Sequence, residues 1–145
     1  MLSPINLLLK VSIDFDGTLE RESVQTYARE LVERGIEVWI VTSRFGDDER
    51  YKSFFQTTIP VGLTNKDLFE IALELGIPKE RVHFTDMDDK WPFLKYWDNF
   101  LWHLDDDWVE NRDILKNTKT KAINSIGANW KSKCERLINK EMMDK

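Results

Sequence analysis

Short apolar runs and segments with helical periodicity alternate along this 145-residue chain. In the helical segments apolar side chains recur three or four residues apart, as in Val24, Tyr27, Ala28 and Leu31, where Gly35 follows as a stop signal. The apolar runs predict strands at residues 6–13, 36–41, 81–85, 100–104 and 119–126. Helices are predicted around 24–32, 47–56, 65–75 and 91–97, and through Trp130 and Leu137. The alternation indicates one Rossmann-like α/β domain, with helices on both faces of a parallel sheet of about five strands.

Composition narrows the functional classes. With 41% apolar and 32% charged residues, the chain resembles an ordinary globular protein. A net charge of −5 disfavours a broad basic surface for nucleic acid. The single Cys134 excludes an internal disulfide and suits a reducing cytosol. Residues 7–9 form an apolar run too short for a signal peptide or a membrane span, so we expect a cytoplasmic protein without a membrane partner.

Two carboxylates, Asp14 and Asp16, follow the first predicted strand, and Gly17 permits a tight turn after them. Paired acids in different environments suit a nucleophile and a general acid/base. Mg²⁺, which prefers oxygen ligands, would offset their repulsion of an anionic substrate. An EF-hand is excluded, because its loop needs further acids before the Gly and a terminal Glu. Solvated acids in a strand-to-loop turn are the alternative interpretation.

The segment Asp14-Phe15-Asp16-Gly17-Thr18 resembles the first motif of the haloacid dehalogenase (HAD) superfamily. The resemblance implies that Asp14 forms an aspartyl-phosphate and that Asp16 is the acid/base. It also implies that the backbone carbonyl of Asp16 helps to hold the magnesium ion. We expect Gly17 and Thr18, within the same motif, to line the substrate site. Asp at the second acidic position is typical of phosphatases and phosphotransferases in that superfamily.

The second predicted strand ends at Thr42-Ser43-Arg44. A hydroxyl and adjacent backbone N–H groups at such a point can hold a phosphate oxygen. The placement of Thr42 resembles the second HAD motif, and Ser43 is a neighbouring candidate. We expect Arg44 to reach the substrate, because a guanidinium fork suits phosphate. A polar strand end without function is the alternative.

A cation is needed to stabilise the nucleophile and the transferring phosphoryl group. Lys90, at the start of a predicted aromatic helix, resembles the lysine of the third HAD motif. Lys66 is a rival, since its surroundings resemble the lysine segment of many capped members; Asp86, Asp88 and Asp89 would then form the last acidic motif. Lys95 is a third option. We prefer Lys90 because its acidic partner is the better motif.

The fourth predicted strand runs into Asp105, Asp106 and Asp107. Carboxylates here, facing those of the first strand, would complete an oxygen-rich Mg²⁺ site. The segment resembles the fourth HAD motif, which implies that Asp105 is a metal ligand and that Asp106 binds metal or orients Lys90. Because Asp106 and Glu110 also fit a D-x-x-x-[D/E] spacing, a register one residue later stays open. Clustered surface acids are the alternative.

The first two motifs are separated by a single predicted helix, so we expect no substrate-specifying cap domain. Three functions compete. The first choice is a Mg²⁺-dependent phosphatase for a small metabolite such as a nucleotide or sugar phosphate. A polynucleotide 3′-phosphatase is the enzyme alternative, because the order Thr-Ser-Arg, Lys, Asp-Asp is similar to such domains. A phosphate-binding regulatory module without catalysis is the third, and the presence of both Asp14 and Asp16 argues against it.

Other conspicuous residues have structural interpretations. The aromatic residues between Trp91 and Trp102 could stack bases or bind a partner, but core packing is the preferred interpretation. His83 and His103 lie within predicted strands, without the spaced Cys or His partners of a metal site. We therefore expect both to be hydrogen-bonded structural histidines.

Overall fold

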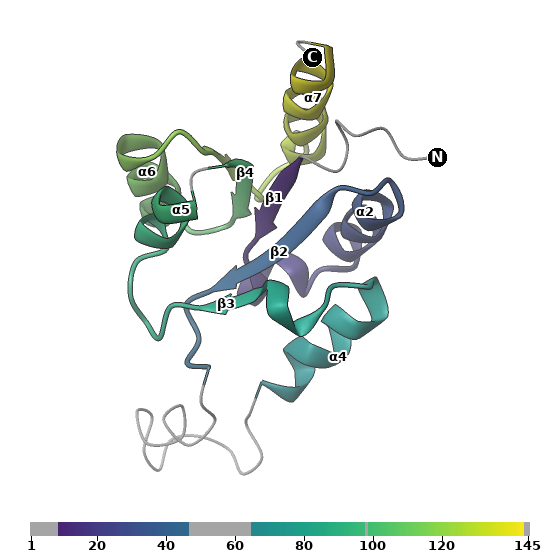
Figure 1. Ribbon diagram of the computed structural model, residues 1–145, viewed down its shortest axis with the longest axis vertical. Coiled ribbons are helices and arrows are strands. Elements are labelled where there is room, and N and C mark those ends of the chain that lie inside the picture. The colour runs from purple at the N-terminus through teal and green to yellow at the C-terminus, as the bar shows by residue number, and fades with distance from the viewer. Residues whose placement is uncertain (1–8, 47–64, 98, 144–145) are drawn as a thin grey trace.

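A computed structural model describes residues 9–46, 65–97 and 99–143 of the chain. Its centre is a five-stranded, all-parallel sheet in the order β3-β2-β1-β4-β5 (Figure 1). The strands are β1 (Lys10–Ile13), β2 (Glu37–Thr42), β3 (Val82–Phe84), β4 (Phe100–Asp105) and β5 (Lys121–Asn124). The chain proceeds from β1 outward to β3 and then returns to β4 on the other side of β1. The strand order therefore reverses between β1 and β4, and ligands of such sheets bind beyond the strand ends at this point.

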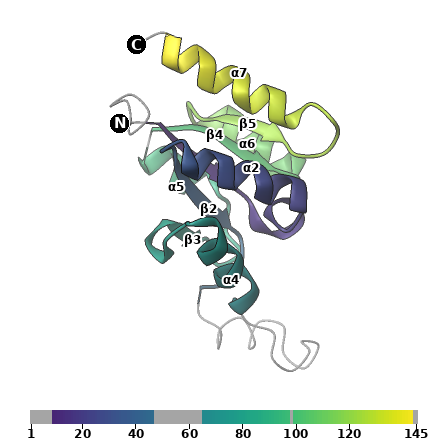
Figure 2. The ribbon, with the colours of Figure 1, turned by 90° about the vertical axis from the view of Figure 1, so that its right-hand side faces the viewer.

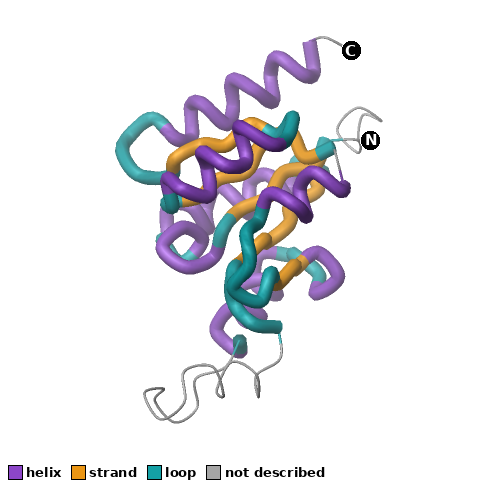
Figure 3. Tube along the Cα trace, turned by 90° about the vertical axis from the view of Figure 1, so that its left-hand side faces the viewer, coloured by secondary structure: helices purple, strands orange, loops and turns teal. Residues whose placement is uncertain are grey.

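Helices cover both faces of the sheet. One face carries α2 (Glu22–Glu33), α4 (Lys66–Leu75) and α7 (Trp130–Met143), and the other carries α5 (Trp91–Trp97) and α6 (Trp108–Asn117) (Figure 2). In Figure 3 the strands lie between these two helical layers. The short segments η1 (Phe15–Leu19) and η3 (Lys79–Arg81) follow β1 and precede β3.

Apolar side chains on one side of each helix explain this layering. In α2 the buried residues are Val24, Tyr27, Ala28 and Leu31, the stripe expected from their spacing. The Tyr27 ring stacks on Trp102 of β4, with 6.4 Å between ring centroids. A smaller cluster under α5 and α6 contains Leu94, Phe100 and Ile114.

The predicted fold class is confirmed, although individual elements differ. Residues 6–8 and the predicted helix at 47–56 lie outside the described residues. The last strand, predicted at 119–126, is shorter, and α6 was not predicted at all. None of the helices in the described parts of the chain is long and apolar enough to cross a membrane.

Candidate active site

The carboxyl ends of β1 and β4 place Asp14 and Asp105 side by side. The two strands are paired with Ile13 opposite Leu104, and the backbone N–H of Asp14 donates to the carbonyl oxygen of Leu104 at 2.9 Å. Both acidic side chains are buried. The long-range pairing that builds the sheet therefore brings together the first and fourth predicted motifs.

Lys90 connects these two carboxylates. Its Nζ donates to Asp14 Oδ1 at 2.7 Å and to Asp105 Oδ2 at 2.6 Å. Burial alone would lower the pKa of Lys90, but the two acids outweigh burial and raise the pKa, so the ammonium stays charged. The other two candidate lysines lie elsewhere: the Lys66 side chain is 80% exposed on α4, and the Lys95 ammonium lies over the Trp91 ring. Of the three, the structure places Lys90 at the acids.

Asp106 completes a cluster of three carboxylates. One oxygen each from Asp14, Asp105 and Asp106 lies within 4.8 Å of the others. Lys90 contacts Asp14 and Asp105, and Asp106 adds a third carboxylate, so the clustered acids outnumber this ammonium. Burial and the neighbouring acids raise the pKa of Asp14 despite the opposing effect of Lys90. Carboxylate oxygens are the preferred ligands of Mg²⁺, so this donor set fits the predicted ion.

Asp105 is the most constrained of the three. Its Oδ2 accepts hydrogen bonds from Lys90 and from His103 Nε2 at 2.8 Å, and its Oδ1 accepts from the backbone N–H of Asp107 at 3.0 Å. Burial alone would raise its pKa, but His103 and Lys90 hold the pKa well below its usual range. Asp105, and not Asp106, therefore orients Lys90. The Glu110 carboxylate adds a contact at 3.3 Å to the backbone N–H of Lys90.

Gly17 and Thr18 lie against Asp106. Gly17 has φ +78°, and a Cβ at this position would be 2.4 Å from Asp106 Oδ2. The buried Thr18 hydroxyl donates to Asp106 Oδ1 at 3.4 Å and lies 3.2 Å from Ser125 Oγ. The Thr18 hydroxyl is thus directed at Asp106, and its expected role as a substrate contact stays a prediction.

Arg44, which is predicted to contact the substrate, is bound by other residues of the protein. Its guanidinium packs over the Phe15 ring and uses all five N–H groups within the protein. Nε and Nη2 donate to Asp16 at 3.0 and 2.8 Å, Nη1 and Nη2 donate to Asp67 at 2.8 and 3.0 Å, and Nη1 reaches Asn65 at 3.4 Å. A phosphate could be bound only by breaking one of these contacts.

The same contacts place the Asp16 side chain. It is half exposed and turned toward Arg44, so it is not one of the three clustered carboxylates. The metal contact expected of Asp16 belongs to its backbone carbonyl and stays a prediction. Arg44 also lowers the pKa of Asp67, chiefly through its hydrogen bonds.

The polar loops after β2 and β3 are joined by backbone hydrogen bonds. The buried Thr42 hydroxyl accepts from Arg44 N at 3.2 Å. Carbonyl oxygens of Thr42, Ser43 and Arg44 accept from the N–H groups of residues 85, 87 and 86 at 2.8, 2.7 and 3.1 Å. In the β3 loop Asp86 and Met87 have φ of 56° and 71°, a strained conformation for such side chains. This strained turn leads directly into the segment that carries Lys90.

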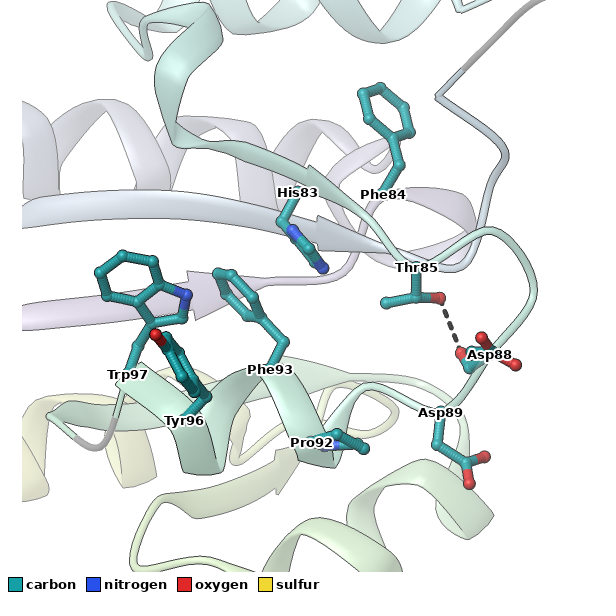
Figure 4. Close-up of a pocket in the computed structure, with 9 residues that line it drawn as sticks. All are labelled: His83, Phe84, Thr85, Asp88, Asp89, Pro92, Phe93, Tyr96 and Trp97. Carbon is teal, nitrogen blue, oxygen red and sulfur yellow. Dashed lines mark hydrogen bonds between the residues drawn. The ribbon is translucent and has the colours of Figure 1, made fainter.

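Beside this loop, a hollow of about 610 Å³ lies between β3 and α5 (Figure 4). His83 points from β3 into it and stacks on Phe93, with centroids 3.8 Å apart. Asp88 and Asp89 lie at the end nearest the strand terminus. Tyr96 and Trp97 of α5 are exposed, so the expectation that the aromatic stretch forms core holds for Phe100 and Trp102 and fails for these two.

Sequence reasoning missed several contacts of the site. Ser12 and His103 are opposite one another on β1 and β4, and they are joined by a hydrogen bond of 2.7 Å. A polar residue inside each of two apolar strands was the available signal. The pairing of Arg44 with Asp67 could not be predicted, because Asp67 lies on a separate helix, α4. No local sequence pattern indicates that this helix packs near the end of β2.

Comparison with known proteins leaves the site to be interpreted from its own geometry. No protein-family model, curated protein or solved structure matches the chain.

Proposed function

We propose that this protein is a Mg²⁺-dependent phosphomonoesterase of the HAD type, with Asp14 as the nucleophile. The observation that carries the proposal is the shared contact of Lys90 with Asp14 and Asp105 at 2.7 and 2.6 Å, beside the third carboxylate of Asp106. One cation among three acids, at the reversal of strand order, is the charge arrangement expected for binding a divalent ion and a phosphate together. The resemblance of the motifs to that superfamily, in the same order, supports the same function.

In the proposed reaction, a carboxylate oxygen of Asp14 attacks phosphorus, and the bond from phosphorus to the leaving oxygen breaks. Asp16 gives its proton to that oxygen and then accepts one from the water that hydrolyses the aspartyl-phosphate. Lys90 would stabilise the charge that develops on the phosphoryl group, and the Thr42 hydroxyl, at the end of β2, would bind a phosphate oxygen.

Asp14, Asp105 and Asp106 would hold the Mg²⁺, with the Asp16 carbonyl as a further oxygen. The ion would offset the repulsion between these acids and the substrate phosphate. Because burial raises the pKa of Asp14, an added positive charge would also favour the ionised form that attacks.

The test is hydrolysis of p-nitrophenyl phosphate by the wild type and Asp14→Asn, with Mg²⁺ or with EDTA. We expect Asp14→Asn to lower kcat by about 10⁴-fold or more. Asp113→Asn is the matched control, because Asp113 pairs with Arg112 on α6, outside the cluster. An acid-quenched reaction should contain phosphorylated wild-type protein. Undiminished turnover by Asp14→Asn would refute the assignment.

The proposed substrate is a small phosphorylated metabolite, such as a nucleotide or sugar phosphate. A panel of phosphorylated metabolites and 3′-phosphorylated oligonucleotides tests the substrate class. Hydrolysis of the oligonucleotides alone would favour the polynucleotide 3′-phosphatase alternative. Binding of phosphate compounds without any turnover would favour the regulatory module.

A further inference from the structure

A buried polar chain runs beneath the carboxylate cluster. Ser12 on β1 and His103 on β4 are fully buried and lie opposite each other in the strand pairing. The Ser12 hydroxyl is 2.7 Å from His103 Nδ1, and His103 Nε2 is 2.8 Å from Asp105 Oδ2. The chain therefore connects the interior of the sheet to Lys90 through Asp105.

The partners of the ring determine which nitrogen carries the proton. In its neutral form the imidazole has one N–H, on either Nδ1 or Nε2. Asp105 is ionised next to Lys90, so it accepts a hydrogen bond and requires the N–H on Nε2. Nδ1 is then an acceptor, and the Ser12 hydroxyl donates to it. Ser12 thus selects the tautomer that His103 presents to Asp105.

The hydrogen bonds that Asp105 accepts show how this tautomer orients its carboxylate. A carboxylate has about four lone-pair positions. Lys90 and His103 occupy two on Oδ2, and the Asp107 N–H occupies one on Oδ1. Among the contacts of the described residues, one position on Oδ1 remains. His103 therefore fixes the carboxylate so that one oxygen serves Lys90 while the other keeps a position for a cation.

We propose that Ser12 and His103 are positioning residues that hold Asp105 in its ligand orientation; this inference rests on the proposed Mg²⁺ site. Neighbouring positions of β4 are filled by Trp102 and Leu104, whose side chains are buried in the hydrophobic core. Burying a serine and a histidine has a desolvation cost that an apolar pair would avoid. The contact of His103 with Asp105, with Ser12 behind the ring, supplies the functional reason.

The experiment uses the full chain and four variants. His103→Leu removes the donor to Asp105, while His103→Gln keeps an amide N–H at about the position of Nε2. Ser12→Ala removes the hydroxyl that selects the tautomer, and His83→Gln is the control at the other of the two histidines. Mg²⁺ affinity is measured by calorimetry. The ring tautomers are read without metal from ¹⁵N NMR of the two imidazoles, with His83→Gln providing the assignment.

For His103→Leu we expect the Kd for Mg²⁺ to rise about 10- to 100-fold, as for other residues that orient metal ligands, and His103→Gln to recover most of this loss. Wild-type His103 should carry its proton on Nε2, and Ser12→Ala should show a mixture of tautomers. Wild-type affinity in His103→Leu, or an Nδ1 proton in the wild type, would overturn the inference while the effect of Asp14→Asn on hydrolysis still stood. If His103→Leu does not fold, His103→Gln and Ser12→Ala are compared instead. The inference would then be overturned if His103→Gln bound Mg²⁺ no more tightly than Ser12→Ala. Absence of Mg²⁺ binding by the wild type would overturn the inference and the proposed metal site together.

Discussion

Asp14 and Asp105 accept hydrogen bonds from the same ammonium group, Lys90 Nζ, at 2.7 and 2.6 Å. The two acids end adjacent parallel strands, so their distance is set by the pairing of β1 with β4. Both are buried, and a buried carboxylate is tolerated only when it is paired. Lys90 therefore has a structural role in the metal-free protein besides its proposed role toward phosphate.

Lys90→Met should expose this structural role. The substitution leaves two buried carboxylates without their cation, and breaking a buried pair in this way costs about 3–5 kcal/mol of unfolding free energy. Urea denaturation in EDTA measures the loss. Lys66→Met is the control, because that side chain is 80% exposed, and its effect should stay within about 0.5 kcal/mol. Equal stability of Lys90→Met and the wild type would contradict the proposed pairing.

Gly17→Ala tests the close approach of the first and fourth motifs. The new Cβ would meet Asp106 Oδ2 at 2.4 Å, so Asp106 must move and Mg²⁺ affinity should fall by about 10-fold or more. A residue with a side chain also loses about 1–2 kcal/mol in this left-handed conformation. Gly127→Ala is a matched control: it has φ +97° but nothing within 4 Å of the new Cβ. It should lose stability without losing Mg²⁺ affinity, and a similar loss of affinity in both variants would exclude the steric explanation.

Arg44→Lys distinguishes positioning from substrate binding. A lysine cannot contact Asp16 and Asp67 through two forks, so Asp16 should lose its fixed orientation. We expect kcat to fall by about 10²-fold with little change in KM, because a displaced acid/base impairs chemistry more than binding. Steady-state kinetics with p-nitrophenyl phosphate measures both constants. A rise in KM at constant kcat would instead support the sequence-based interpretation of Arg44 as a substrate contact.

His83 should make stability depend on pH. Burial lowers its pKa in the folded protein, so the unfolded chain takes up the proton first as pH falls through about 6.5. The contribution of His83 to stability is thus present at pH 8 and decreases as the solution is acidified. The difference in unfolding free energy between the wild type and His83→Gln should shrink between pH 8 and pH 5. Parallel pH profiles for the two proteins would show that His83 has the same pKa in both states.

The strand ends could be predicted from sequence because apolar runs stop where the polar motifs begin. That pattern gave the parallel sheet, and it placed Asp14, Thr42 and Asp105 at one edge, as the structure confirms. The motif alone could not decide between Lys90 and Lys66, because the choice depends on tertiary structure. Whether the Lys90 side chain reaches Asp14 depends on how α5 packs against the sheet.

The helix α6 escaped prediction for an identifiable reason. Only Asn111 and Ile114 are buried along it, so its apolar periodicity is weak. Asp107 caps its start by accepting from the N–H groups of Val109 and Glu110 at 2.9 and 3.3 Å. The Asp107-x-x-Glu110 spacing was a helix-start signal, but these acids were interpreted only as a metal motif. One run of aspartates therefore carries both the helix cap and the proposed metal ligands.

The backbone bonds between the loops after β2 and β3 have a mechanical consequence. Residues 42–44 and 85–87 are joined peptide to peptide, so neither loop can shift alone without breaking a ladder of three N–H···O contacts. Any displacement of Thr42 should therefore be accompanied by displacement of residues 85–87, the turn that precedes Lys90. A phosphate analogue bound at Thr42 should therefore also restrict the motion of residues 85–87. We expect amide hydrogen exchange in both loops to become slower together when vanadate is added.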